Sequence, residues 1–138
     1  MKAFFCCLFF VCSFSLSRAE SQVNNPYPFT LQNDKGNFGV EVDVKDHSIY
    51  LKYHDLFAKY GYEGNGYSWA GMIEHLLRKD APELLKRLEF LPDEGAFYAY
   101  AKTDTDRQQF IQIISPVFSN LKALEDLIKS ADHSRIDD

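Results

Sequence analysis

Residues 29–44 read FTLQNDKGNFGVEVDV, and this stretch decides the fold class expected for the chain. Its second half alternates between two kinds of residue, with Phe38, Val40, Val42 and Val44 on one side and Gly39, Glu41 and Asp43 on the other. A period of two predicts a β-strand with one buried and one solvated face. The turn-forming composition of residues 33–37 makes residues 29–32 the other arm of a β-hairpin.

A second β-hairpin is predicted from residues 88–101, LEFLPDEGAFYAYA. Its first arm carries Phe90, its turn is Pro-Asp-Glu-Gly at residues 92–95, and its second arm covers residues 97–101. Proline, aspartate and glycine favour such turns because of their backbone preferences and short side chains. Two hairpins in one chain can join edge to edge as a single antiparallel sheet.

Helical periodicity is found between and after the hairpins. One apolar stripe has three- and four-residue spacing: Ile49, Tyr50, Tyr53, Leu56, Phe57 and Tyr60. We interpret this stripe as part of the hydrophobic core. A second helix is expected from Trp69, with Ser68 as its N-cap, and a third from the Asp-Ala-Pro-Glu segment at 80–83. A further helix is expected from Asp106. It should break or kink at Pro116 and restart near residues 119–120.

The sequence therefore predicts a single α+β domain at residues 29–130, in which two β-hairpins form one antiparallel sheet packed by about four helices. Residues 20–28 are expected to be a linker and residues 131–138 a flexible tail. The polar composition and two prolines of the first segment, and the charges of the second, suggest these assignments.

Residues 1–19, MKAFFCCLFFVCSFSLSRA, have the form of a secretory signal peptide. A lysine precedes an apolar run, and the small residues Ser17 and Ala19 stand at positions −3 and −1 of the expected cleavage site. An uncleaved membrane anchor is the alternative, whereas the bulky residues before Cys12 argue against lipidation. All three cysteines lie in this segment, so the mature chain would hold no disulfide and no thiol nucleophile. A periplasmic or secreted location is expected.

The charge of the mature chain argues against nucleic acid as a partner. Without Lys2 and Arg18, 13 of the 15 basic residues remain beside 20 acidic ones, a formal net charge of −7. An acidic chain without a basic run argues against binding nucleic acid through its phosphates. The charge fits either solubility or attraction to a basic partner.

No catalytic or metal-binding motif stands out. The histidines at 47, 54, 75 and 133 lack metal-ligand spacing, so we expect no metal and no cofactor. The neighbouring acids at 93–94 and 125–126 read as a solvated turn and a solvated helix face. A hydrolase using paired carboxylates remains an alternative, because its two acids need to meet only in space.

The segment KYGYEGNGYSW, residues 59–69, is rich in both glycine and aromatic residues. A dinucleotide-binding loop is not favoured, because a helix precedes it and Glu63 would repel phosphate. Two interpretations remain. Either Gly64-Asn65-Gly66 is a turn whose residues reach positive φ without strain, and the rings of Tyr62, Tyr67 and Trp69 fill the core. Or some of these rings face outward as a contact surface for a partner.

Three stretches resemble the immunity protein 51 family of bacterial polymorphic toxin systems. They are GYEGNGYSW at 61–69, APELL at 81–85, and the pattern F-x-P-x3-A-F-x-A-Y at 90–100. The resemblance extends from Phe29 to Ile128. It implies a non-enzymatic protein that binds and neutralises a cognate protein toxin, protecting the producing cell or its siblings. Proteins of this kind are often cytoplasmic, so a signal peptide would mean that the toxin is met in the periplasm.

On this view the glycine-rich segment divides into two sets of residues. The expected partner contacts are Tyr62, Glu63, Asn65 and Tyr67. The residues expected to shape the turn are Gly61, Gly64, Gly66 and Trp69. The alternatives from other classes are a small periplasmic hydrolase and a general protein-interaction module of the cell envelope. The oligomeric state is left open.

Overall fold

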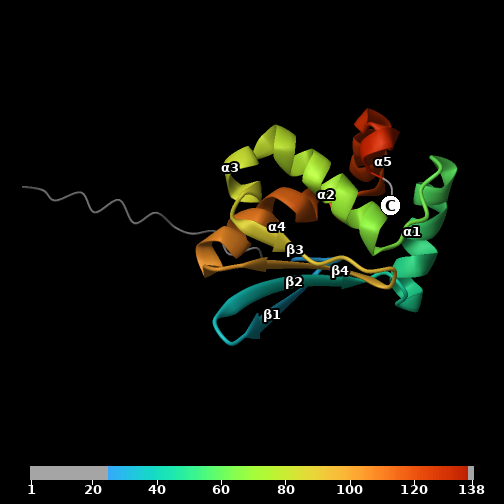
Figure 1. Ribbon diagram of the computed structural model, residues 1–138. Helices are drawn as coiled ribbons and strands as arrows, with labels where there is room; N and C mark the ends of the chain where they lie inside the picture. The colour runs from blue at the N-terminus through green and yellow to red at the C-terminus, as the bar shows by residue number, and fades with distance from the viewer. Residues whose placement is uncertain (1–24, 137–138) are drawn as a thin grey trace, which may run out of the picture.

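The computed structural model describes residues 25–136, and these form the predicted α+β domain (Figure 1). The four antiparallel strands are β1 (Thr30–Asp34), β2 (Asn37–Asp43), β3 (Leu88–Phe90) and β4 (Ala96–Ala101). Their order in the sheet is β1-β2-β4-β3, so the two hairpins join through β2 and β4 as predicted. The predicted signal peptide and residues 20–24 lie outside the described residues.

Five α-helices and a short 3-10 helix complete the domain: α1 (His47–Lys59), α2 (Gly66–Asp80), α3 (Pro82–Leu85), α4 (Asp104–Phe118), α5 (Leu121–Ser130) and η1 (His133–Arg135). Helices α2 and α4 contact the strands directly. Figure 1 shows these helices above the sheet, with α1 at one end of it and α5 in a further layer. Within the described chain, no helix lies on the other face of the sheet.

The core is organised around Trp69, which is fully buried. Its ring lies 4.9 Å from Tyr53 and 5.8 Å from Phe57 of α1, 5.1 Å from Phe118 at the end of α4, and 6.0 Å from Phe29, centroid to centroid. The Tyr53 hydroxyl also donates a hydrogen bond of 2.7 Å to the Phe118 carbonyl. Trp69 is therefore a core residue that joins α1, α2, the end of α4 and the start of β1.

Two helix boundaries differ from those predicted. Helix α2 begins at Gly66 and is capped by Asn65 instead of Ser68. Helix α4 is not broken at Pro116 but continues to Phe118, and the restart follows at α5, capped by Asn120. Proline interrupts a helix by removing one N–H bond to the preceding turn. Pro116 lies in the last turn of α4, so the interruption coincides with the end of the helix at Phe118.

The C-terminal segment is more structured than the predicted flexible tail. Residues 133–135 form η1, and Ile136 is buried. An added Cβ atom at Gly71 of α2 would lie only 2.7 Å from Ile136 Cγ2. The chain end thus packs against α2 as far as Ile136, while residues 137–138 lie outside the described part.

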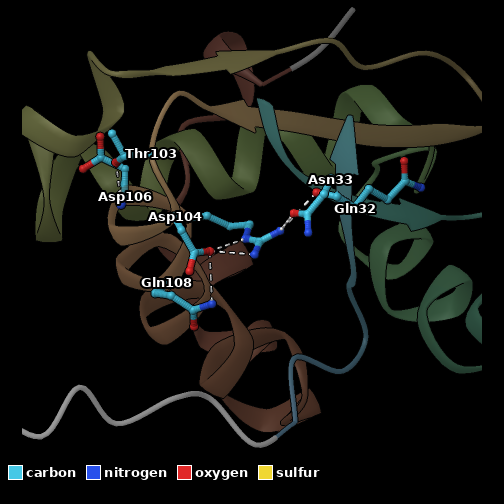
Figure 2. A network of polar contacts seen from close by, with 7 residues as sticks. Gln32, Asn33, Thr103, Asp104, Asp106 and Gln108 are labelled. Carbon is cyan, nitrogen blue, oxygen red and sulfur yellow. Dashed lines mark hydrogen bonds and ion pairs between the residues drawn. The ribbon is translucent and has the colours of Figure 1, made fainter. Parts of the chain in front are cut away.

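A buried arginine fastens the first hairpin to α4 (Figure 2). Arg107 donates hydrogen bonds to Asp104 Oδ1 at 2.6 and 3.0 Å, and to the Gln32 carbonyl and Asn33 Oδ1 at 3.0 and 2.6 Å. Its guanidinium also lies 5.1 Å from the centre of the Phe38 ring. A buried charge is costly unless it is paired, and these hydrogen bonds pair the guanidinium. Because two of them go to Gln32 and Asn33, the network holds this end of β1 against α4.

Helices α1 and α5 are connected by a second polar contact. Glu125 Oε1 accepts hydrogen bonds from Lys59 Nζ at 2.7 Å and from the Tyr60 hydroxyl at 2.6 Å. These two hydrogen bonds lower the pKa of Glu125 to about 2, against an ordinary value of 4.5. The contact therefore favours the folded state only while the carboxylate is ionised.

This carboxylate makes stability depend on acid in a defined window. A folded-state pKa below the unfolded one means that the stabilisation is complete above about pH 4.5 and is lost as pH falls toward about 2. We expect Glu125→Gln to lower the free energy of unfolding at pH 7 and to flatten its fall across this window. Urea unfolding at several pH values measures both effects. Lys59→Met should do the same, and an unchanged acid response in both variants would contradict this role.

Candidate partner-binding site

The glycine loop, residues 61–66, joins α1 to α2 and reverses the chain in two steps. Gly61 has φ +84°, and its N–H donates to the Ala58 carbonyl at 3.0 Å while the N–H of Tyr62 donates to Phe57 at 3.1 Å. Gly64 has φ +71°. Both lie in the left-handed region that glycine adopts without steric cost, as their predicted place in the turn requires.

Gly66 is needed for a different reason. It is the first residue of α2 and has no positive φ, contrary to the expectation for residues 64–66. An added Cβ atom would lie 2.0 Å from the Ala96 carbonyl oxygen and 2.1 Å from that of Asp93. The missing side chain lets the glycine loop pack directly on the turn between β3 and β4.

Asn65 and Ser68 fix the second half of the loop. Asn65 Oδ1 accepts the Ser68 N–H at 2.9 Å, and Ser68 Oγ accepts the Gly64 N–H at 3.1 Å. Asn65 Nδ2 also donates to Glu63 Oε2 at 2.9 Å. The side chain expected to contact a partner is therefore the N-cap of α2, and it orients the neighbouring carboxylate.

The structure separates the two tyrosines that were both expected to be exposed. Tyr62 is only 4% exposed and stacks on His133, with ring centroids 4.3 Å apart and planes 14° apart. Its predicted exposure is wrong, because the C-terminal segment covers it. Tyr67 is 39% exposed in the first turn of α2, and Glu63 is also exposed. These two side chains are accessible to a partner.

Beside the loop lies an open hollow of about 270 Å³. It is lined by Val44, Lys45, Tyr50, His54, Glu63, Gly64, Asn65 and Glu94. On its α1 side the rings of Tyr50 and His54 are stacked 4.4 Å apart. The hollow places aromatic surface and charged groups next to Glu63.

Tyr50 is a functional candidate that the sequence reasoning placed in the core. It is 47% exposed, whereas Ile49, Tyr53 and Phe57 are the buried residues of α1. A residue directly after Ile49 is rotated by about 100° around the helix, and His54 falls on the same flank one turn later. Helical spacing could have separated Tyr50 from the core stripe. Nothing local in the sequence pointed to Lys45 or Glu94.

Three of the four acids in the pairs noted in the sequence have structural partners. Asp93 Oδ1 accepts the N–H groups of Gly95 and Ala96 at 2.7 and 2.8 Å, Glu125 binds Lys59, and Asp126 lies 2.5 Å from Lys122. Residues 25–136 contain no cluster of acidic, histidine or cysteine residues arranged to hold a metal ion. No helix in that range has the length and apolar character needed to span a membrane. The exposed rings and charges around the hollow suit recognition of another protein.

The packing of Gly66 should reverse the usual effect on stability of replacing a helical glycine by alanine. At an unobstructed helix position, Gly→Ala stabilises by up to about 1 kcal/mol. Gly66→Ala should instead destabilise by about 3 kcal/mol, because two backbone carbonyls must move. Gly36→Ala is the control, since it meets no neighbouring atom within 4 Å and carries only the strain of φ +84°, about 1–2 kcal/mol. Chemical denaturation compares the two, and a Gly66→Ala protein as stable as wild type would refute the close approach.

The two tyrosines should also differ in their contribution to stability. Tyr62→Ala removes a buried ring and should cost about 2 kcal/mol or more of unfolding free energy. Tyr67→Ala removes a partly exposed ring and should change it by less than about 1 kcal/mol. Thermal and chemical unfolding of both variants test this. Equal losses would mean that the burial of Tyr62 against His133 is wrong.

Comparison with known proteins agrees with the earlier resemblance. A family model described as immunity protein 51 matches residues 29–133. The matched segment runs from Phe29, beside Trp69, to His133, beside Tyr62, and so includes the whole sheet and the glycine loop. Comparisons with curated proteins and with solved structures returned no match. Because the match covers most of the sequence, the chain belongs to the immunity protein 51 family.

Proposed function

We propose that this protein neutralises a bacterial toxin by binding it in a stable complex, without catalysing a reaction. Membership of an immunity protein family supports a toxin partner. The observation that carries the proposal is the surface beside the glycine loop, where Glu63 is exposed next to the stacked Tyr50 and His54 and Tyr67 is exposed in the first turn of α2. Tyrosine is among the residues that contribute most to protein interfaces.

This surface is organised before any partner arrives. The bond from Asn65 Nδ2 orients the Glu63 carboxylate, and the packing of Gly66 fixes the loop against the β3–β4 turn. Binding loses less conformational entropy when the contact groups are already held in place. A preorganised surface of this kind supports tight inhibition by occlusion of the toxin's active site or of another essential surface.

Charge and location complete the proposal. A mature chain with a net charge of −7 would associate faster with a basic toxin than with an acidic one. If residues 1–19 act as a signal peptide, the complex forms in the periplasm or outside the cell. The toxin would then act on the cell envelope or be intercepted before entry.

The alternative hydrolase has less support than binding. Of the four acids that suggested it, Asp93 stabilises a turn, and Glu125 and Asp126 form ion pairs. Glu63 and Glu94 do line one hollow, but Glu63 is exposed and bound by Asn65. A general interaction module of the envelope would use the same surface, and only the toxin itself distinguishes it from an immunity protein.

Coexpression tests the proposal directly. The toxin encoded beside this gene is expressed in the periplasm with and without the protein, and survival of the host is measured. We expect wild-type protein to protect, and Tyr50→Ala with Tyr67→Ala to reduce protection at least about tenfold. Survival of cells that express the toxin alone would rule out the pairing.

A matched control separates binding from stability. Leu121→Ala removes a side chain with the same 39% exposure as Tyr67, but from the start of α5. It should leave protection unchanged. Equal protection by the double tyrosine variant would remove Tyr50 and Tyr67 from the interface while leaving the function in place.

A further inference from the structure

The face of the sheet opposite the helices carries a distinct set of side chains. Alternation in β2 and β4 directs Val40, Val42, Phe97 and Ala99 into the core. It directs the outer face, which we define as Gly39, Glu41 and Asp43 of β2 with Tyr98 and Tyr100 of β4, away from the helices. Figure 1 shows the helices on the opposite side of the sheet.

The two tyrosines of the outer face are held by the strand register. Tyr98 lies opposite Glu41, and Tyr100 lies opposite Gly39. Tyr100 lies against Gly39, since an added Cβ atom there would be 3.4 Å from Tyr100 Cε1. Both tyrosines are half-buried, which leaves part of each ring accessible on a rigid strand. Rings held in this way are effective contact residues, because binding immobilises little that was free.

The centre of this face is negatively charged. The charge of Glu41 is the main cause that raises the pKa of Tyr98, and burial and the carboxylates of Asp93 and Asp43 act in the same direction. Glu41 is the register partner of Tyr98, and Asp43 lies two residues along the same strand on the same face. Glu89 of β3 adds a fourth acid beside Tyr100, its partner in the register.

The nearby cations lie toward the ends of the sheet. Lys45 approaches Gly95 in the β3–β4 turn. At the other end, Lys86 pairs with Glu83, Arg87 pairs with Asp106, and Lys102 follows β4. Lys86, Arg87 and Lys102 line one hollow with Tyr100 and Glu89, so the carboxylates dominate on the Tyr98 side of the face. A partner that covers this side therefore meets a tyrosine ring flanked by Glu41 and Asp43.

We propose that the outer face docks a cationic surface of the toxin. This inference rests on the proposed function and names a contact surface for it. Charge complementarity selects the occupant, since lysine and arginine side chains bind carboxylates and also stack on tyrosine rings. A second copy of this chain is a poor occupant, because a two-fold interface would bring the same carboxylates face to face.

The outer face also adjoins the hollow beside the glycine loop. Asp93 acts on Tyr98 from the β3–β4 turn, and the next residue, Glu94, lines the hollow. The same turn packs on Gly66 through the carbonyls of Asp93 and Ala96. One partner can therefore contact both surfaces around this turn.

Binding measurements test the inference with an inactivated form of the toxin encoded beside this gene. Tyr98→Ala and Tyr100→Ala should each raise Kd at least about tenfold. Glu41→Gln with Glu89→Gln keeps the shape of the face, so it tests the charge even if a tyrosine variant folds poorly. This pair should slow association about three- to tenfold at low salt and weaken its dependence on ionic strength.

The matched control removes the same number of charges from the helical side of the molecule. Glu74→Gln with Asp126→Asn neutralises one acid on α2 and one on α5, each paired within its own helix. It should leave the association rate within about twofold of wild type. An equal effect of both double variants would overturn the inference, because it would mean that only net charge matters.

Three outcomes decide between the two proposals. Failure of wild-type protein to bind or suppress the toxin overturns both the function and the docking face. Wild-type binding that is weakened by Tyr50→Ala with Tyr67→Ala, but not by the tyrosine variants of the outer face, overturns only the docking face. Sedimentation of the protein alone as a dimer that Tyr98→Ala converts to a monomer, with toxin binding intact, also overturns it.

Discussion

The burial of the Trp69 ring among four other aromatic rings is the interaction on which the rest of the domain depends. It brings together α1, α2, the end of α4 and the start of β1, which are far apart in sequence. Among the buried side-chain polar atoms of residues 25–136, Trp69 Nε1 is the one without a hydrogen-bond partner. Leaving such a group unpaired costs about 1–3 kcal/mol, so close packing of the ring outweighs the missing bond here.

The fold could be predicted because its signals are local. Alternation in residues 38–44 and turn residues near 33–37 and 92–95 are read over a few positions, and the sheet confirms them. The start of α2 was misplaced because both Asn65 and Ser68 are good N-caps, and a local rule cannot choose between them. The burial of Tyr62 depends on His133, which the chain brings back only after four further α-helices. Such long-range contacts leave no trace in a local pattern.

The candidate site was predictable only in part for the same reason. The composition of the glycine loop marked the correct segment, and Glu63 and Tyr67 are accessible there. Gly66 was expected to serve backbone conformation, but it serves a close approach to a turn formed by a different hairpin. The polarity of the outer face was hidden in β4, because AFYAYA reads as apolar throughout. It becomes visible only when the register places Tyr98 beside Glu41.

The alternation of β2 and β4 has a consequence for how such a protein can change over time. Outward-facing residues on these strands make few contacts with the core, so most of them can be replaced at little cost to folding. The inner layer is formed by other positions, among them Val40, Val42 and Phe97. If the outer face docks the partner as proposed, recognition and stability depend on alternate positions of the same strands. Substitutions in one set can then accumulate without disturbing the other.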